Sequence, residues 1–187
     1  MSITTGRGDT GETGLLYGGR IAKDDLHTEA YGSLDEAISA IGMARALEGD
    51  PSRAERLLAL QRELFVVGAE LATGVGHHAD LERNFATVTP AMTDALHAQI
   101  HELEARVPLP KSFVVPGGSA AGAALDLART LVRRAERRAV TLQREGELEN
   151  PEVVRYLNRC SDLLFMLARE AEQGATVAAG DHRRRAT

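Results

Sequence analysis

The chain has 187 residues and a formal net charge of -5, which fits a single domain and argues against general nucleic-acid binding. Hydrophobic residues make up 43% of the sequence, but aromatic residues only 4%, and tryptophan is absent. The core must therefore be aliphatic, which suits packed helices better than a β-sandwich or barrel. One cysteine, Cys160, excludes an intrachain disulfide. The polar N-terminus and the lack of an apolar run of roughly 18 to 20 residues lead us to expect a cytoplasmic protein without a membrane span.

Residues 1–28 are glycine-rich, and we expect a loop there because frequent glycines disfavour a helix. Apolar residues then recur at helical spacing in five segments. The predicted helices cover residues 29–46, 53–72, 89–107, 119–145 and 151–172. No hairpin signal and no internal repeat is visible, so the sequence predicts an all-α fold, a five-helix up-and-down bundle. The bundle would occupy residues 29–172, and residues 173–187 would be a disordered tail.

Five arginines lie in the ten-residue stretch RTLVRRAERR. On a helix, Arg129, Arg133 and Arg137 are four residues apart and share one face, and Arg134 and Arg138 form an adjacent stripe. Guanidinium groups at one-turn spacing repel each other unless an anion lies across them. A solvated helix face would normally place glutamates at these offsets. From this stretch alone, a bound anion and a plain surface face are both open.

The last predicted helix, NPEVVRYLNRCSDLLFMLAR, is apolar on most sides but carries a polar stripe. The stripe consists of Arg155, Asn158, Arg159 and Asp162, which follow helical spacing. Asparagine is unfavourable inside a helix, so Asn158 indicates a specific hydrogen-bonding role. Such a stripe is also typical of the solvent edge of a helix, and the sequence leaves both interpretations open.

The N-terminal stretch TTGRGDTGETGLLYGGRIAKDD is neither a Walker A loop nor a dinucleotide-binding fingerprint. Backbone N–H groups of a glycine-rich loop can nevertheless cradle phosphate oxygens. The stretch contains Lys23, one of two lysines in the chain. A flexible N-terminus is the plainer interpretation. The loop, the lysine and the arginine-rich helix together favour a polyphosphate ligand.

The sequence offers no evident protein nucleophile. It contains neither HExxH nor GxSxG, and Cys160 falls on an apolar helix face, as a buried and inert thiol would. His97 and His101 are four residues apart but have no evident acidic partner, and we predict no metal site made of side chains. If the chain is an enzyme, a substrate or a cofactor must supply the nucleophile.

Four stretches in this order resemble the PduO-type ATP:cob(I)alamin adenosyltransferases. They are the glycine-rich loop, EAYGSLDEAISAIGMARA, SFVVPGGSAAGAALDLARTLVRRAERR and NPEVVRYLNRCSDLLFMLAR. The resemblance implies a five-helix bundle assembled as a homotrimer with sites between subunits. It implies transfer of the 5′-deoxyadenosyl group of ATP to the cobalt of a reduced corrinoid, with release of triphosphate. Cobalt(I) would be the nucleophile.

The same resemblance implies the ligands and partners. ATP and Mg²⁺ would bind, and cobalamin would be a substrate. A flavoprotein would reduce the corrinoid, and a cobalamin-dependent enzyme would accept the product.

The resemblance also implies roles for individual residues. Phe113 would exclude the lower axial ligand of cobalt, which leaves a four-coordinate cobalt(II) that is easier to reduce, and Asp162 would share the corrinoid site. Asp35 would pair with Arg129 of a neighbouring subunit. The expected catalytic residues are Arg133, Arg129, Asp35 and Phe113. The nucleotide would contact Thr5, Gly6, Arg7, Gly8, Asp9, Gly11, Thr13, Gly14, Lys23, Arg133, Arg134, Glu136, Arg137 and Asn158.

The loop departs from the family pattern at two positions. Gly6 stands where a basic residue is usual, and Arg7 where a second threonine is usual. The lost hydroxyl could weaken ATP binding, or the charge of Arg7 could replace it. Two other functions remain open: a non-catalytic trimer that senses ATP or delivers adenosylcobalamin, and a structural bundle whose arginines pair with acids across subunits.

Overall fold

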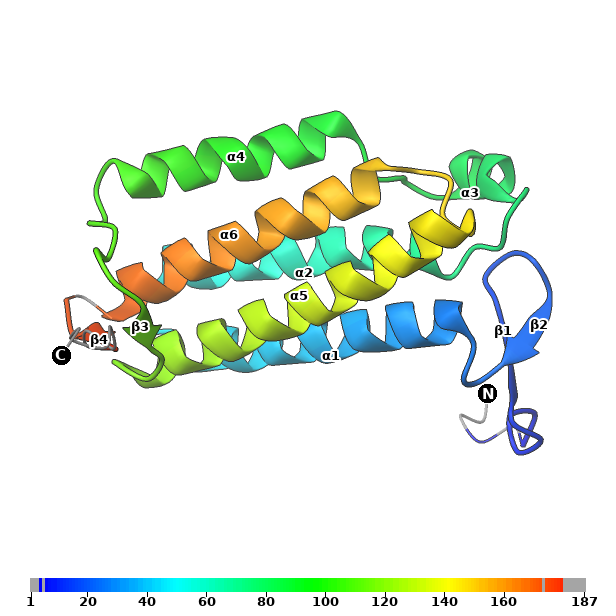
Figure 1. Cartoon of the computed structure of the whole chain (residues 1–187), viewed down its shortest axis with the longest axis horizontal. Helices are drawn as coiled ribbons and strands as arrows, with labels where there is room; N and C mark the ends of the chain where they lie inside the picture. The colour runs from blue at the N-terminus through cyan, green and yellow to red at the C-terminus, as the bar shows by residue number, and fades with distance from the viewer. Residues whose placement is uncertain (1–3, 5, 173, 180–187) are drawn as a thin grey trace, which may run out of the picture.

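The computed structural model describes residues 4, 6–172 and 174–179, and this part of the chain is mainly helical (Figure 1). It contains six helices. They are α1 (Leu26–Ala46), α2 (Pro51–Leu71), α3 (His78–Asn84), α4 (Pro90–Glu104), α5 (Ala120–Glu145) and α6 (Glu152–Glu172). All five predicted helices are present, but the count of five is wrong, because the connection between α2 and α4 contains the short helix α3.

Helix α3 has only 7 residues, too few to show a helical period in the sequence. So short a helix is marginal on its own, and tertiary contacts stabilise it. Leu81 is completely buried, and His78 Nε2 lies 3.1 Å from a carboxylate oxygen of buried Glu70 on α2. The sequence does not reveal these contacts, so it does not reveal the helix.

Four helices begin after a residue whose side chain accepts hydrogen bonds from the free backbone N–H groups of the first turn. These capping residues are Asp25, Asp50, Thr89 and Ser119. The cap at Asp25 explains why α1 begins at Leu26 rather than at residue 29 as predicted.

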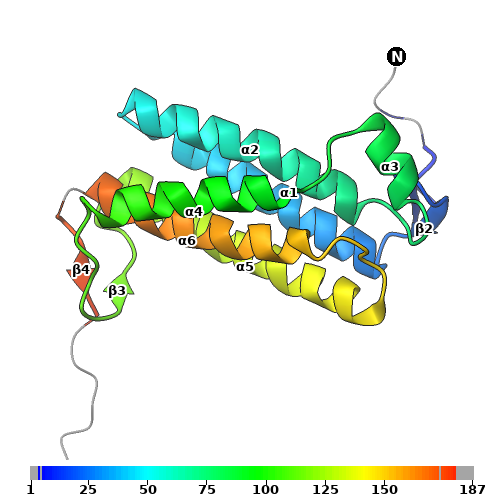
Figure 2. The same ribbon diagram turned by 90° about the horizontal axis from the view of Figure 1, so that it is seen from above.

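The long helices α1, α2, α5 and α6 pack around an aliphatic core, and α4 covers α6 (Figures 1 and 2). Each long helix contributes buried leucines, for example Leu34, Leu64, Leu125 and Leu157. Burying one such side chain stabilises the fold by about 1.5–3 kcal/mol. Helix α1 runs antiparallel to α5, so the start of α1 lies beside the end of α5 (Figure 1). No helix in the described residues has the length and apolarity that crossing a bilayer requires.

The glycine-rich N-terminal stretch contains a hairpin. Strands β1 (Glu12–Gly14) and β2 (Arg20–Ala22) pair antiparallel, so the prediction of no strand pair is wrong. Strands of 3 residues are too short to show an alternating pattern. The hairpin is also held by docking onto the segment after α2, where Gly74 N donates to Tyr17 O at 2.8 Å.

A second strand pair lies at the opposite end of the bundle (Figure 1). Strands β3 (Val114–Val115) and β4 (Val177–Ala178) pair antiparallel. Strand β4 belongs to the stretch 173–187 that we expected to be a disordered tail, so the structure corrects that expectation for this segment. Its order follows in part from Glu172, which accepts a hydrogen bond from Thr176 Oγ1 at 2.6 Å. Residues 173 and 180–187 lie outside the described residues.

Candidate functional site

The N-terminal loop contacts Lys23, an exposed residue directly after β2. The backbone N–H of Lys23 donates to Gly11 O at 2.8 Å. Gly8 lies so close to the ammonium group that a Cβ added there would be 2.8 Å from Lys23 Nζ. A side chain at position 8 would displace the lysine, so this close approach needs glycine. The loop therefore places glycine backbone against a cation, which is one requirement of a phosphate site.

Two further contacts shape the loop. Arg20 Nη2 donates to Arg7 O at 3.0 Å, and Arg20 Nε donates to Glu12 Oε2 at 3.2 Å. Burial raises the pKa of Tyr31 of α1 above its usual value, and Thr13 of β1 lies beside this phenol.

The remaining predicted loop residues lie where a ligand can reach them. Gly8 and Thr13 are half-buried, and the exposed residues are Gly6, Arg7, Asp9, Gly11 and Gly14. The predicted contact at Thr5 lies outside the described residues.

Two of the five arginines in the stretch RTLVRRAERR of α5 face α1. Arg134 forms an ion pair with Glu36, and Arg138 forms one with Glu29 at 3.4 Å. Exposed pairs of this kind contribute roughly 0–1 kcal/mol each, so they orient side chains more than they stabilise the fold. The structure thus places Arg134, an expected nucleotide contact, against α1.

The other predicted pair, Arg133 and Arg137, is exposed on α5, one helical turn apart. Among the described residues, neither guanidinium has an ion-pair partner. Glu136 lies beside them, half-buried, on the same helix. Two unneutralised guanidinium groups at this spacing repel each other, and an anion lying across both would relieve that repulsion. The spacing in the sequence predicted that the two arginines share one face, which the structure confirms, and the structure adds that both are exposed.

Arg129 begins the same row but has a partner within the chain. Its Nε donates to Asp126 Oδ1 at 3.1 Å, and buried Asp126 also accepts a bond of 2.6 Å from Arg169 Nη2. Asp35, the predicted partner of Arg129 in a neighbouring subunit, is exposed on α1. Within the described part of the single chain, Asp35 forms no ion pair.

The polar stripe of α6 is joined by its own hydrogen bonds. Arg159 Nη2 donates to Asn158 Oδ1 at 2.9 Å and lies 3.2 Å from Asp162 Oδ2. All three residues are half-buried. The stripe is therefore an ordered polar strip along the edge of the helix, with the Asn158 amide N–H₂ group available as a donor.

The contact between Asp126 and Arg169 fixes the antiparallel register of α5 and α6. Arg137 follows Asp126 by as many residues as Asn158 precedes Arg169. Because both helices rise by about 1.5 Å per residue, Arg137 and Asn158 lie at the same level of the bundle.

Phe113 lies at the other end of the molecule. It directly precedes β3, whereas the β1–β2 hairpin and the start of α1 occupy the opposite end of the bundle (Figure 1). Helix α5 runs between the two ends with a length of about 39 Å. The Phe113 side chain is 90% exposed. A single chain therefore does not bring Phe113 together with Lys23.

A family model described as Cobalamin adenosyltransferase matches residues 3–171. The chain belongs to the cobalamin adenosyltransferase family. It is 42% identical over 173 residues to the corrinoid adenosyltransferase of Bacillus subtilis, an alignment that covers 90% of this chain and 86% of that protein. It is 41% identical over 182 residues to the corrinoid adenosyltransferase of Mycobacterium tuberculosis, covering 94% and 91%. With the corrinoid adenosyltransferase PduO of Citrobacter freundii it is 39% identical over 175 residues, and it spans 51% of that longer protein.

Solved structures of adenosyltransferases share the fold. A variant of the PduO-type ATP:corrinoid adenosyltransferase from Lactobacillus reuteri, complexed with cobalamin and ATP, matches with a TM-score of 0.83 at 36% identity. The match covers 92% of this chain and 91% of that one. A second variant of that enzyme, complexed with ATP, matches with a TM-score of 0.80 at 35% identity, covering 91% and 94%.

Within this adenosyltransferase, sequence analysis missed a buried charged cluster behind Arg129. Asp126, Arg169 and Glu172 have side chains that are 3% exposed or less. The available signal was that Arg169 and Glu172 continue an apolar helix, where a charged residue is tolerated only if it is paired. The pairing itself depends on α5 and could not be deduced from α6 alone.

The described residues contain no group of three or more His, Cys, Asp or Glu side chains that could hold a metal ion. Cys160 is fully buried, and burial raises the pKa of its thiol. The prediction that Cys160 is buried is therefore confirmed.

Proposed function

We propose that the chain transfers the 5′-deoxyadenosyl group of ATP to the cobalt of a reduced corrinoid, cob(I)alamin, and releases triphosphate. One observation carries the proposal: Arg133 and Arg137 are exposed and have no ion-pair partner among the described residues, on a helix whose Arg138 pairs with Glu29, shortly after Lys23 in the chain. Relatives named corrinoid adenosyltransferase, and a related structure complexed with cobalamin and ATP, support both substrates.

Arg137 lies toward the end of α5 that is beside the start of α1, and Arg133 lies at the middle of α5. Lys23 closely precedes α1, and Glu29 in the first turn of α1 pairs with Arg138 on α5. Arg137 directly precedes Arg138 on α5 and is exposed. A triphosphate held by the loop would thus extend toward Arg137 and Arg133.

The reaction requires positioning and charge stabilisation rather than a protein nucleophile. Cobalt(I) attacks C5′ of ATP, so that a Co–C bond forms while the C5′–O bond breaks and its electron pair leaves with triphosphate. Lys23, Arg133 and Arg137 would neutralise the charge that develops on this leaving group. Holding both substrates in line would supply the remaining acceleration.

Mg²⁺ would be held largely by the triphosphate oxygens, the hard ligands it prefers. Asp9 is an exposed carboxylate in the loop and would face the same phosphates. The Asp9 carboxylate and a nearby phosphate group repel each other unless a cation lies between them. Asp9 is therefore the side chain we expect to bind Mg²⁺ or one of its waters.

The active form would be a homotrimer with sites between subunits. The separation of Phe113 from Lys23 within one chain supports this, because a neighbour would supply the corrinoid end of each site. Asp35, exposed on α1, would pair with Arg129 of that neighbour, and Asp162 would help bind the corrinoid. In the cytoplasm, a flavoprotein would deliver the electrons, and a cobalamin-dependent enzyme would take the product.

The test is to mix the protein with reduced cobalamin, ATP and Mg²⁺ and to follow the absorption spectrum of the corrinoid. We expect conversion to adenosylcobalamin. Arg133→Ala should abolish it while the helical circular dichroism stays unchanged. Arg144→Ala is the matched control, because Arg144 is an exposed arginine in the last turn of the same helix.

Two outcomes would contradict the proposal. If the wild-type protein leaves the spectrum of every reduced corrinoid unchanged, the activity is wrong. Tight corrinoid binding without product formation would then favour the non-catalytic delivery trimer, the alternative that the altered loop residue Arg7 suggests. If Arg133→Ala and Arg144→Ala react equally fast, Arg133 has no part in the mechanism.

A further inference from the structure

The segment between α4 and α5 carries Phe113, and both of its ends are attached to the last turn of α6. At its start, Arg106 donates a hydrogen bond to Glu170. At its end, Gly118 N donates to Glu172 Oε1 at 3.1 Å. Glu170 and Glu172 are thus two carboxylates on one helical turn that hold the two ends of one segment.

Glu172 is the more confined of the two. Its side chain is completely buried, and it accepts a bond of 3.1 Å from Arg169 Nη2, which also reaches Asp126. A Cβ added at Gly118 or at Gly122 would lie 2.8 Å from carbon atoms of the Glu172 side chain. The start of α5 therefore packs directly on this carboxylate, which has no room to move away.

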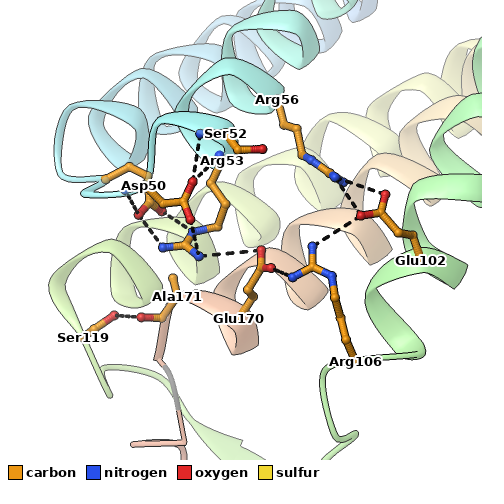
Figure 3. A network of polar contacts seen from close by, with 10 residues as sticks. Asp50, Ser52, Arg53, Arg56, Glu102, Arg106, Ser119, Glu170 and Ala171 are labelled. Atoms are coloured by element: carbon orange, nitrogen blue, oxygen red, sulfur yellow. Dashed lines mark hydrogen bonds and ion pairs between the residues drawn. The ribbon is translucent and has the colours of Figure 1, made fainter.

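Glu170 joins the same turn to α2 and to the end of α4 (Figure 3). One carboxylate oxygen pairs with Arg106, and the other lies 3.8 Å from Arg53 Nη1. The Glu170 side chain is only 11% exposed. Arg106 is 47% exposed, whereas Arg53 is 12% exposed, so the Glu170 charge is confined between a solvent-facing arginine and a mostly buried one.

Glu172 also holds the strand that touches Phe113. It accepts the hydroxyl hydrogen bond of Thr176, and Thr176 leads directly into β4. At the end of β4, Ala179 N donates to Phe113 O at 2.8 Å. The Phe113 ring itself is 90% exposed, so backbone contacts rather than packing fix its position.

We propose that Glu170 and Glu172 are positioning residues of the corrinoid end of the site. They fix the backbone around Phe113 through Arg106, Gly118 and Thr176, and so hold the ring where it displaces the lower ligand of cobalt. This proposal rests on the proposed function, and in particular on the role expected of Phe113. Neither carboxylate touches substrate.

The first test compares Glu170→Gln, Glu172→Gln and Thr176→Val with the wild type in the adenosylation assay. We expect the KM for corrinoid to rise by about tenfold, since misplacement by about 1 Å has effects of this size or larger. The fraction of four-coordinate cob(II)alamin in the ATP complex should fall, and the KM for ATP should stay constant. Thr176→Val removes one hydroxyl and remains informative if Glu172→Gln fails to fold.

The matched control is Glu152→Gln, at the opposite end of the same helix. Glu152 is a buried glutamate in the first turn of α6 and accepts a bond of 2.7 Å from Thr93 Oγ1. It should lower the melting temperature without changing the KM for corrinoid. Equal effects of Glu152→Gln and Glu172→Gln on that KM would overturn the proposal, because loss of stability alone would then explain both.

A second measurement does not depend on activity. The chain has no tryptophan, so Phe113→Trp introduces a single fluorescent reporter. Its anisotropy should fall when Glu170→Gln, Glu172→Gln or Thr176→Val is added and should not change with Glu152→Gln. If the wild type makes no adenosylcobalamin, the proposed function fails, and the anisotropy still decides whether the carboxylates fix this segment. An unchanged anisotropy would overturn the positioning role even in an active enzyme.

Discussion

Gly18 and Gly74 meet backbone against backbone. A Cβ added to Gly18 would lie 3.1 Å from Gly74 Cα, and Gly18 has a φ of 112°, a conformation that side chains rarely adopt. Next to this contact, Gly74 N donates to Tyr17 O. The β1–β2 hairpin is thus docked onto the segment after α2 at a point where both backbone segments carry a glycine.

We expect Gly18→Ala to displace the hairpin from the segment after α2. The KM for ATP should rise, because Lys23 directly follows the second strand of the hairpin. The helical content should not change, since the hairpin lies outside the core. Gly19→Ala is the control: Gly19 also has a positive φ, of 92°, but a Cβ there would meet nothing within 4 Å. Steady-state kinetics with ATP would show the difference, and equal KM values for the two variants would contradict the docking argument.

Arg137 and Arg134 should respond differently to removal. Arg137→Ala removes an unneutralised charge, so the melting temperature should stay constant or rise. It should also raise the KM for ATP by about 10- to 100-fold, because a hydrogen bond to a charged group contributes roughly 1.5–3 kcal/mol. Arg134→Ala breaks the pair with Glu36 and should leave the KM for ATP nearly unchanged. A rise in KM for Arg134→Ala as large as for Arg137→Ala would assign Arg134 to the nucleotide as well.

The long helices could be predicted because each carries its own signals. Asp50 and Pro51 mark the start of α2, and Thr89 and Pro90 mark the start of α4. The spacing of the arginines likewise placed Arg133 and Arg137 on one exposed face. These features are local, so a single sequence is sufficient to find them.

The rest could not be predicted, because it depends on contacts between distant segments. Burial of Leu81 stabilises helix α3, and the backbone contact between Gly18 and Gly74 stabilises the hairpin. Neither contact leaves a periodic pattern. The separation of Phe113 from Lys23 follows from the direction of α5 in the bundle, which spacing along the chain does not give.

Cys160 should be unreactive in the folded protein. It is completely buried on α6, and burial raises the pKa of its thiol, so little thiolate forms at neutral pH. With a chromogenic disulfide reagent at pH 8, we expect no reaction with the native protein and one thiol per chain after unfolding in guanidinium. A native reaction as fast as that of free cysteine would show that the core around α6 opens readily.

Glu48 and Arg53 should make stability depend on acid pH. Arg53 donates two hydrogen bonds to Glu48, of 2.8 Å and 3.0 Å, and this holds the pKa of the carboxyl below its usual value. The Glu48 side chain is 2% exposed. A lowered folded-state pKa means that the stabilisation is complete above the unfolded value of about 4.3 and is lost as pH falls through the folded value.

We therefore expect Glu48→Gln to lower the free energy of unfolding at pH 7 by about 1–3 kcal/mol, the cost of leaving a buried charged partner poorly satisfied. The deficit relative to the wild type should shrink as pH falls below about 4.3, because the unfolded wild type then binds a proton at Glu48 that the native state does not yet bind. Thermal unfolding of both proteins would measure this difference in the free energy of unfolding. Both must be at the same protomer concentration, since assembly also shifts the melting temperature. Glu145→Gln, in an exposed pair with Arg144, should change little at any pH. A Glu48→Gln deficit that stays constant from pH 7 to pH 3 would mean that the ionised carboxylate contributes nothing beyond its shape.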